Sequence, residues 1–216
     1  MFDGRAFRLI AYLAPLAVGF GVAAALALTT GSPPGRRLRA AGGVLGAALV
    51  PLGVAAFGES FAAFAKVSIL LASFGSFVAG LYLLGEACLL PREVSQVLSG
   101  FVLAALVGSV FWAGPLIREA ADSDPGGLGT YRRISLAVAV SPYMVMGYSV
   151  FGHEPLHGDA LRPLGLHDYQ FGRPSWGSTS AGYALAGLLL FGAARGLHTL
   201  RKGRGSEAKP PSSRPS

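Results

Sequence analysis

The sequence predicts an all-α fold, a polytopic integral membrane bundle of about six transmembrane helices, from three observations. Apolar residues make up 52% of the 216 residues, and charged residues make up only 13%, about half the usual share. The charges leave long charge-free runs, which at about 1.5 Å of helical rise per residue can each cross roughly 30 Å of hydrocarbon. The remaining polar chain is too short to cover so many apolar helices in water. The runs are residues 9–30, 40–58, 67–85, 94–117, 134–152 and 174–194.

The first run, 9–30, follows two basic residues, Arg5 and Arg8, and contains an Ala-Leu-Ala triplet at 25–27 that resembles a signal-peptide cleavage site. Its apolar stretch is longer than the roughly 7 to 15 residues of a signal peptide. This length favours a retained span, and cleavage stays the alternative.

The second run, 40–58, is rich in Gly and Ala and contains Pro51. Proline and glycine are tolerated in transmembrane helices because neighbouring helices satisfy the freed backbone groups. Gly42 and Gly46 form a small-xxx-small pair, which is suited to close helix contact. An ordinary Ala/Gly-rich helix is the plainer interpretation.

Ionisable residues stand outside the runs. Glu59, Lys66 and Glu86 bracket the third run, 67–85, where long side chains can reach the membrane interface. All acidic residues and histidines lie outside the six runs, which argues against proton pumps and against haem held between helices. The single Cys88 is typical of a small buried apolar residue. Since no phosphate-binding loop motif occurs, ATP chemistry would come from another chain.

Basic residues near the helix ends predict the orientation. Six helices with both termini in the cytoplasm place 12 of the 18 basic residues inside and leave 6 outside. If the second run does not span, the N-terminus moves outside and the division becomes 13 to 5. Charge alone does not decide between five helices and six, but either arrangement predicts a cytoplasmic C-terminus.

The outer loop, residues 153–173, contains the motif H-E-x-x-H at 153–157, which has the spacing of a zinc metalloprotease helix. Pro155 lies within the motif and Gly158 follows it, and both disfavour a helix there. We therefore predict no protease site. A looser metal site remains an alternative, because three histidines and a carboxylate can bind a divalent ion without a helix. Its candidates are His153, His157, Asp159 and His167.

The rest of this loop is apolar and rich in aromatic residues, with Tyr169, Phe171 and Trp176 at its end. This composition predicts short interfacial or re-entrant helices that could gate a path or hold lipid. We expect the transmembrane domain to cover residues 1–200. The basic Pro/Ser-rich tail, residues 201–216, is expected to be disordered in the cytoplasm. The net charge of +7 then fits lipid headgroups and topology rather than nucleic acid.

Two stretches resemble the membrane subunits of ABC exporters. The first is "VAGLYLLGEACLLPREVSQVLSGFVLAALVGSVFWAGPLI", residues 78–117, in which a short polar turn separates two apolar helices. The second is "SPYMVMGYSVFG", followed by an outer segment and a final helix that ends in "RKGR". Together they cover about half the chain, and they are similar to the small type 2 permeases of gliding-motility and copper-enzyme maturation systems. The N-terminal half departs from that pattern, since only "MFDGRAFR" precedes the first span.

The resemblance implies an alternating-access mechanism, in which a dimer of the chain opens in turn to each side of the membrane. A separate cytoplasmic ATPase would drive it. The ATPase would dock near residues 59–66 and 118–133. Small residues of the second and fourth helices would allow sliding contacts: Gly42, Gly46, Gly100, Ala104, Ala105 and Gly108.

The expected function is therefore a permease-like subunit of an ABC-type exporter in a bacterial inner membrane. We expect the chain to have no enzymatic activity, cofactor or metal of its own. We also expect it to form homo- or hetero-oligomers in the lipid bilayer. The alternative is a structural or assembly subunit of a larger membrane complex. A membrane enzyme or metal site built on the histidine loop is the third hypothesis.

Overall fold

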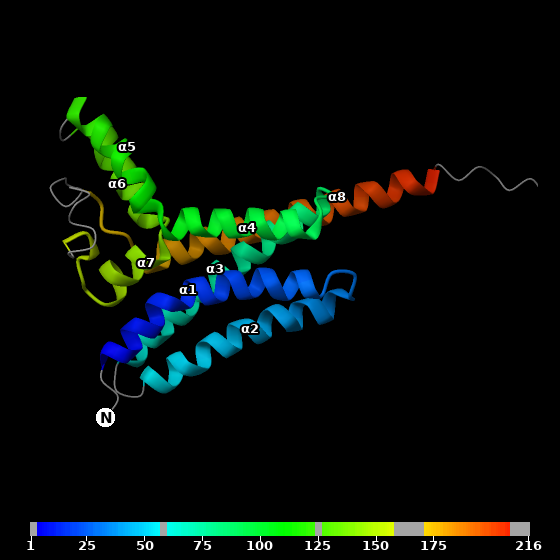
Figure 1. Cartoon of the computed structure of the whole chain (residues 1–216), viewed down its shortest axis with the longest axis horizontal. Coiled ribbons are helices and arrows are strands. Elements are labelled where there is room, and N and C mark those ends of the chain that lie inside the picture. The colour runs from blue at the N-terminus through cyan, green and yellow to red at the C-terminus, as the bar shows by residue number, and fades with distance from the viewer. Residues whose placement is uncertain (1–3, 57–59, 124–126, 158–170, 208–216) are drawn as a thin grey trace, which may run out of the picture.

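A computed structural model describes residues 4–56, 60–123, 127–157 and 171–207 (Figure 1). Every regular element in these ranges is helical, as the all-α prediction requires. In chain order the elements are α1 Gly4–Leu28, α2 Pro34–Ala55, α3 Phe61–Ala87, α4 Arg92–Val107, α5 Ser109–Ser123, α6 Leu128–Ala139, α7 Pro142–Val145, the π-helix η2 Met146–Val150, the 3₁₀ helix η3 Pro155–His157 and α8 Trp176–Glu207.

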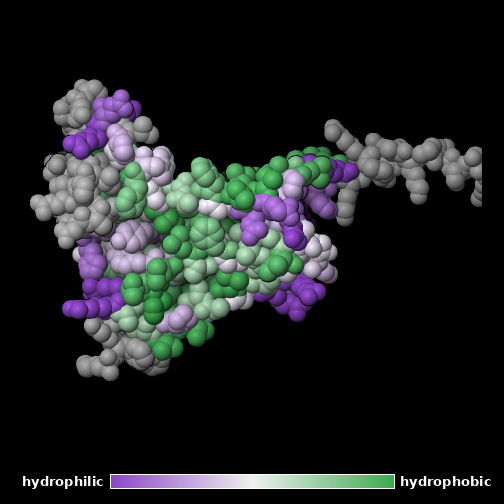
Figure 2. All heavy atoms as spheres, viewed as in Figure 1, coloured by the Kyte–Doolittle hydropathy of each residue, from purple (hydrophilic) through white to green (hydrophobic). Residues whose placement is uncertain are grey.

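Four of the described helices are long and apolar enough to cross a membrane. They comprise α1 from Arg5, all of α2 and α3, and α8 as far as Arg201. Helices α4 and α5 pass the same test only together, as a bent pair, which would give five crossings. Apolar side chains cover the middle of the molecule, and hydrophilic ones gather at its two ends (Figure 2). The chain thus has the build of a multi-pass membrane protein, but the predicted number of six spans is not confirmed.

The fourth run, predicted as one helix over 94–117, is broken. Helix α4 ends at Val107, and α5 leaves Gly108 at an angle of 69°. With 16 residues, α4 spans roughly 24 Å, short of the roughly 30 Å of a hydrocarbon core. Helix α4 alone is therefore too short to cross a hydrocarbon core without α5.

The fifth run, predicted as one helix over 134–152, is also broken. Helix α6 ends at Ala139, and Ser141 takes an extended conformation with φ −89° and ψ 116°. The next residue is Pro142, and a proline pushes the residue before it away from helical geometry. The run continues as the short α7 and the π-helix η2, so it forms no continuous span.

The core lies between α1, α3 and α8. Helices α3 and α8 run side by side in the same direction and make the most extensive helix contact of the described residues. Phe74 of α3 packs edge-on against Tyr183 of α8, with the ring centroids 5.1 Å apart. Further along, the backbones meet at Gly80 and Gly187.

Helix α2 lies at the margin of the bundle and buries only Leu52 and Ala55. Gly42 and Gly46 were expected to make close helix contacts. A side chain added at either residue would meet nothing within 4 Å, so this pair faces away from the other described helices.

The two ends of the described chain lie at opposite ends of the bundle (Figure 1). Helix α1 begins at what we term the N-terminal end, beside the α2–α3 connection and the α5–α6 hairpin. Helix α8 finishes at the other end, which we term the C-terminal end, where Arg201 donates a hydrogen bond to the carbonyl of Ala87. This differs from the six-helix expectation, in which both termini share one side, whereas an odd number of crossings, as in the five-helix alternative, puts the two ends on opposite sides.

The GRRLR segment, residues 35–39, lies at the C-terminal end, together with the final turns of α8. Basic residues thus stand at both ends, since Arg5 and Arg8 of α1 and Lys66 of α3 lie in the first turns of helices that begin at the N-terminal end. This distribution over both ends does not orient the molecule.

Two further predicted boundaries differ. Helix α8 continues to Glu207, so the first residues of the predicted tail, 201–216, are helical. The predicted outer loop, 153–173, contains the three-residue η3, and its residues 158–170 lie outside the described ranges, as does the tail beyond Glu207.

Candidate functional site: a junction of helix ends beside an apolar crevice

Four helix ends meet where the two predicted spans are broken. Helices α4 and α6 end there, at Val107 and Ala139, and α5 and α7 begin there, at Ser109 and Pro142. The last carbonyls of a helix have no partner within it. In hydrocarbon each of these carbonyls needs another donor, because water is absent.

Two serines cap helix ends across this junction, each by donating its hydroxyl to a carbonyl of the other broken run. The hydroxyl of Ser109, at the start of α5, donates to the carbonyl of Ala137 in α6 at 2.6 Å. The hydroxyl of Ser141, just before α7, donates to the carbonyl of Val107 in α4 at 3.0 Å. Both serines are fully buried. Each broken helix thus caps the other, which fixes where the two breaks lie relative to one another.

Helix α8 supplies two more donors. Thr179 donates through Oγ1 to the carbonyl of Ala139 at 3.1 Å, and the Tyr183 hydroxyl donates to the carbonyl of Val140. On the other side, the indole Nε1 of Trp112 donates to the carbonyl of Ala105 at 2.6 Å. The carbonyls of Ala105, Val107, Ala137, Ala139 and Val140 therefore accept hydrogen bonds from side chains of α5, of α8 and of Ser141.

A crevice of about 340 Å³ lies against this junction. Its walls are Phe77 of α3, Leu106 of α4, the end of α6 and the face of α8 from Ser178 to Ala186. This volume is at the lower end of the range for small-molecule sites. The polar groups at its edge, Thr179 and Tyr183, are already engaged with carbonyls, so the crevice offers mainly apolar surface.

His153, a predicted site residue, lies at the N-terminal end. Its Nε2 is 2.9 Å from Nη1 of Arg8 in α1. Because the arginine is always protonated, Nε2 is the acceptor and the imidazole proton is on Nδ1. Nearby, Tyr12 packs against Tyr143, with ring centroids 4.6 Å apart, and Arg173 donates to Glu154 at 2.7 Å.

The structure does not give H-E-x-x-H the helix of a zinc protease. His153 and Glu154 are non-helical, and His157 ends a 3₁₀ helix of only three residues. Asp159 and His167 lie outside the described residues, so the four-residue metal hypothesis stays a prediction. Within the described ranges, no three His, Cys, Asp or Glu residues are grouped so that they could hold a metal ion.

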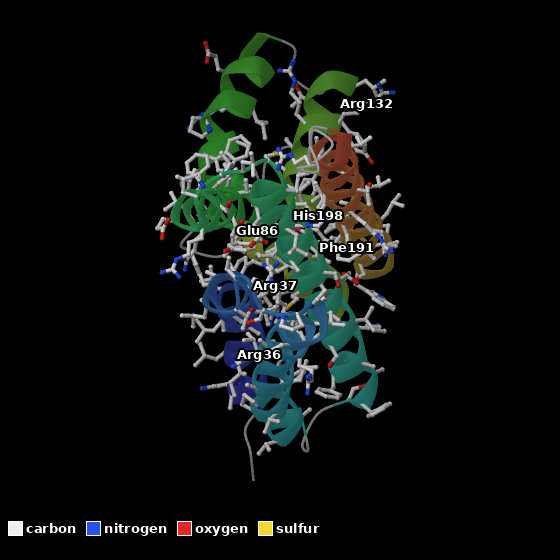
Figure 3. All side chains as sticks on the ribbon, turned by 90° about the vertical axis from the view of Figure 1, so that its right-hand side faces the viewer. Arg36, Arg37, Glu86, Arg132, Phe191 and His198 are labelled. Carbon is white, nitrogen blue, oxygen red and sulfur yellow. The ribbon has the colours of Figure 1, made fainter. Side chains whose placement is uncertain are left out.

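Charged pairs in the described helices stand at the two ends of the bundle. At the C-terminal end, Arg37 of α2 and Glu86 of α3 form an ion pair of 2.7 Å, in which both side chains are mostly buried (Figure 3). At the N-terminal end, the ammonium of Lys66 lies 5.9 Å from the centre of the Trp176 ring. Both pairs suit an interface, where a charged group reaches water and its aliphatic part stays in lipid.

Sequence reasoning did not find Ser109, Ser141, Thr179 or Tyr183. Two local signals were present, the Gly108-Ser109 pair and the Ser141-Pro142 pair, but each stands inside an apolar run that reads as one span. No protein-family model, curated protein or solved structure matches this chain, so its site is interpreted from its own geometry.

Proposed function

We propose that the chain is the permease-like subunit of an exporter that moves an apolar or amphipathic molecule and works with a separate ABC-class ATPase. The observation that carries the proposal is the junction, where two interrupted helices meet beside an apolar crevice. Transporters commonly bind their substrates where spanning helices are broken. Non-helical backbone at membrane depth is tolerated only where protein buries it or where it lines a cavity. We also propose that the chain is a multi-pass protein of a bacterial inner membrane.

The two segments at which the resemblance puts the ATPase lie at the same end of the molecule. The end of α2, the start of α3 and the outer parts of α5 and α6 lie at the N-terminal end (Figure 1). Phe61, the first residue of α3, is 82% exposed there. An exposed aromatic side chain beside a connection is suited to a protein contact. This arrangement supports docking at the N-terminal end.

The proposal puts the N-terminal end in the cytoplasm. If four spans and the bent pair cross the membrane, the end of α8 is then on the other side. If the ATPase docks at these segments, the C-terminus is therefore not in the cytoplasm. A cytoplasmic C-terminus, as expected from the sequence, is compatible only with the second candidate function, described next.

The second candidate is an assembly subunit of a larger membrane complex, without transport of its own. The open face of α2 favours it. Gly42 and Gly46 face away from the other described helices, and this kind of surface allows a helix of another chain to approach closely.

An affinity pull-down from native membranes tests the two functions. We expect a soluble ATPase to copurify with the wild type, to be lost with Phe61→Ser and to be retained with Leu38→Ser. Leu38 is a matched control, since it is 76% exposed and lies at the C-terminal end.

Copurification of other membrane subunits without any ATPase would contradict the exporter proposal. Gly46→Leu then tests the assembly function. Because a Cβ at residue 46 meets nothing within 4 Å and the residue is exposed, we expect this variant to keep the described fold and to change a contact with a partner.

A further inference from the structure

The α5–α6 hairpin leans away from the bundle (Figure 1). Val110, Ala113 and Ile117 of α5 pack with Ile134, Ala137 and Val138 of α6 in a small core that also includes Met144 of α7 and Leu156 of η3. This packing pairs the middle of α5 with the middle of α6. Apart from the hydrogen bond from Trp112 to the carbonyl of Ala105, the described chain leaves much of the outer face of the hairpin exposed.

Near the junction this outer face is apolar and aromatic. Phe111 and Trp112 are each 55% exposed, and Leu136 on α6 is 65% exposed. They continue the exposed apolar surface of α4, where Phe101 is also turned outward. Since α4 is part of a candidate span, the simplest environment for both surfaces is lipid.

Farther from the junction the face becomes basic. Arg118 of α5 and Arg132 and Arg133 of α6 are all exposed, at similar levels along the paired helices. Arg118 follows Trp112 by six residues, or roughly 9 Å of helix. Among the described side chains of the hairpin, Glu119 follows Arg118 directly and is exposed, and Leu128 at the start of α6 is also exposed. From the junction outward the face therefore changes from apolar to mainly basic.

This order matches a bilayer surface. The headgroup region extends several ångströms beyond the hydrocarbon on each side. Aromatic residues favour the boundary, and arginines favour the phosphates just outside it. A protein partner would not require this gradation along the hairpin.

We propose that the α5–α6 hairpin is an interfacial anchor for anionic phospholipid. Phe111, Trp112 and Leu136 occupy the acyl-chain boundary, and Arg118, Arg132 and Arg133 bind the lipid phosphates. The anchor does not depend on transport.

Tryptophan fluorescence tests the anchor. The chain has two tryptophans, so Trp176→Phe leaves Trp112 as the single reporter. The purified full-length variant is reconstituted into phosphatidylcholine vesicles, with and without phosphatidylglycerol, that carry bromine at defined acyl positions. We expect Trp112 to emit at short wavelength and to be quenched most by bromine near the carbonyl end of the acyl chain. Long-wavelength emission that bromine does not quench would overturn the proposal.

The arginines are tested in the same vesicles. We expect the apparent affinity of the Trp112 signal for phosphatidylglycerol to fall roughly fivefold for each arginine removed in Arg132→Gln and Arg133→Gln. Arg36→Gln and Arg39→Gln, at the C-terminal end, are the controls and should leave the Trp112 signal unchanged. An equal signal in both lipids, insensitive to Arg132 and Arg133, would overturn the lipid-binding role.

Two other occupants have their own signatures, and each would overturn the proposal. If a second copy covers the face, Trp112 is shielded from bromine and its emission depends on the ratio of protein to lipid. If free phosphate is the ligand, inorganic phosphate changes the emission of the detergent-solubilised protein. Circular dichroism confirms that each variant is folded, and Trp112→Phe serves as the reference for Trp176 alone.

Discussion

At Gly187 the backbones of α3 and α8 approach more closely than a side chain would allow. A Cβ placed there would lie 2.9 Å from the carbonyl carbon of Ser76 and 3.0 Å from the amide nitrogen of Phe77. Both are backbone atoms, which cannot turn aside as the end of a flexible side chain can. On the facing helix, a Cβ at Gly80 would lie 2.8 Å from the carbonyl oxygen of Gly187. This crossing therefore requires glycine on both helices.

Gly187→Ala is expected to destabilise the protein by about 2 kcal/mol, because the added methyl group forces the two helices apart. Unfolding in mixed detergent, followed by circular dichroism, measures the change in the free energy of unfolding. The matched control is Gly192→Ala on the same helix, where an added Cβ meets nothing within 4 Å. Equal effects of the two substitutions would show that helix propensity, rather than the close approach, is responsible.

A second residue-scale prediction concerns metal binding. The Nε2 of His153 accepts from Arg8, so a metal ion at that nitrogen would have to displace a guanidinium. We expect purified wild-type protein to hold less than stoichiometric zinc after dialysis, and His153→Ala to behave in the same way. Elemental analysis is the measurement. Bound metal that both His153→Ala and His157→Ala abolish would contradict this expectation.

At the scale of elements, the junction is held by side chains from segments that are distant in sequence. Thr179→Val removes the donor to the carbonyl of Ala139 with little change in shape, and we expect it to lower the stability by about 1 kcal/mol. Thr199→Val is the control, because that hydroxyl bonds only within its own exposed turn, to Gly196. Thermal unfolding in detergent compares the stabilities of the two variants. An equal loss of stability would show that the bond at the junction is not the cause.

The serine caps also fix the direction of the hairpin. We expect Ser109→Ala combined with Ser141→Ala to broaden the distribution of distances between a spin label on α5 and one on α3, because both carbonyl contacts at the base are lost. Pulsed electron spin resonance in nanodiscs, with Cys88 replaced by Ser in the background, records the distribution. Ser76→Ala, which removes only a bond within α3, is the reference. A distribution as narrow as the wild type's would mean that packing alone directs the hairpin.

At the scale of the whole molecule, the chain enters at one end of the bundle and leaves at the other. Cys88 is exposed beside Ala87, the residue to which Arg201 of α8 is bonded. We expect an impermeant maleimide to label Cys88 only from the side that holds the end of α8. With Cys88→Ser in the background, Ser60→Cys at the start of α3 should be labelled only from the opposite side. Labelling of both positions from one side would contradict the arrangement.

The sequence was sufficient for the parts of this molecule that depend on composition alone. Helices α1, α2, α3 and α8 follow charge-free runs, because a span through lipid needs little more than length and apolarity. The breaks at Gly108 and Ser141 were not predicted, because hydropathy carries no information on where a helix bends. The hydrogen bonds that stabilise these bends join residues distant in sequence. The hydroxyls of Ser109, Ser141 and Thr179 bond to carbonyls 28, 34 and 40 residues away, respectively. Pro142 was a visible signal, but it was outweighed by the apolar residues around it.

The meeting of four helix ends has an electrostatic consequence. A helix carries about half a negative elementary charge at its C-terminus and half a positive one at its N-terminus. Because α4 and α6 end where α5 and α7 begin, these half-charges largely offset one another. The helix ends therefore add little net field to the crevice beside them, which is the environment that the proposed apolar or amphipathic substrate requires.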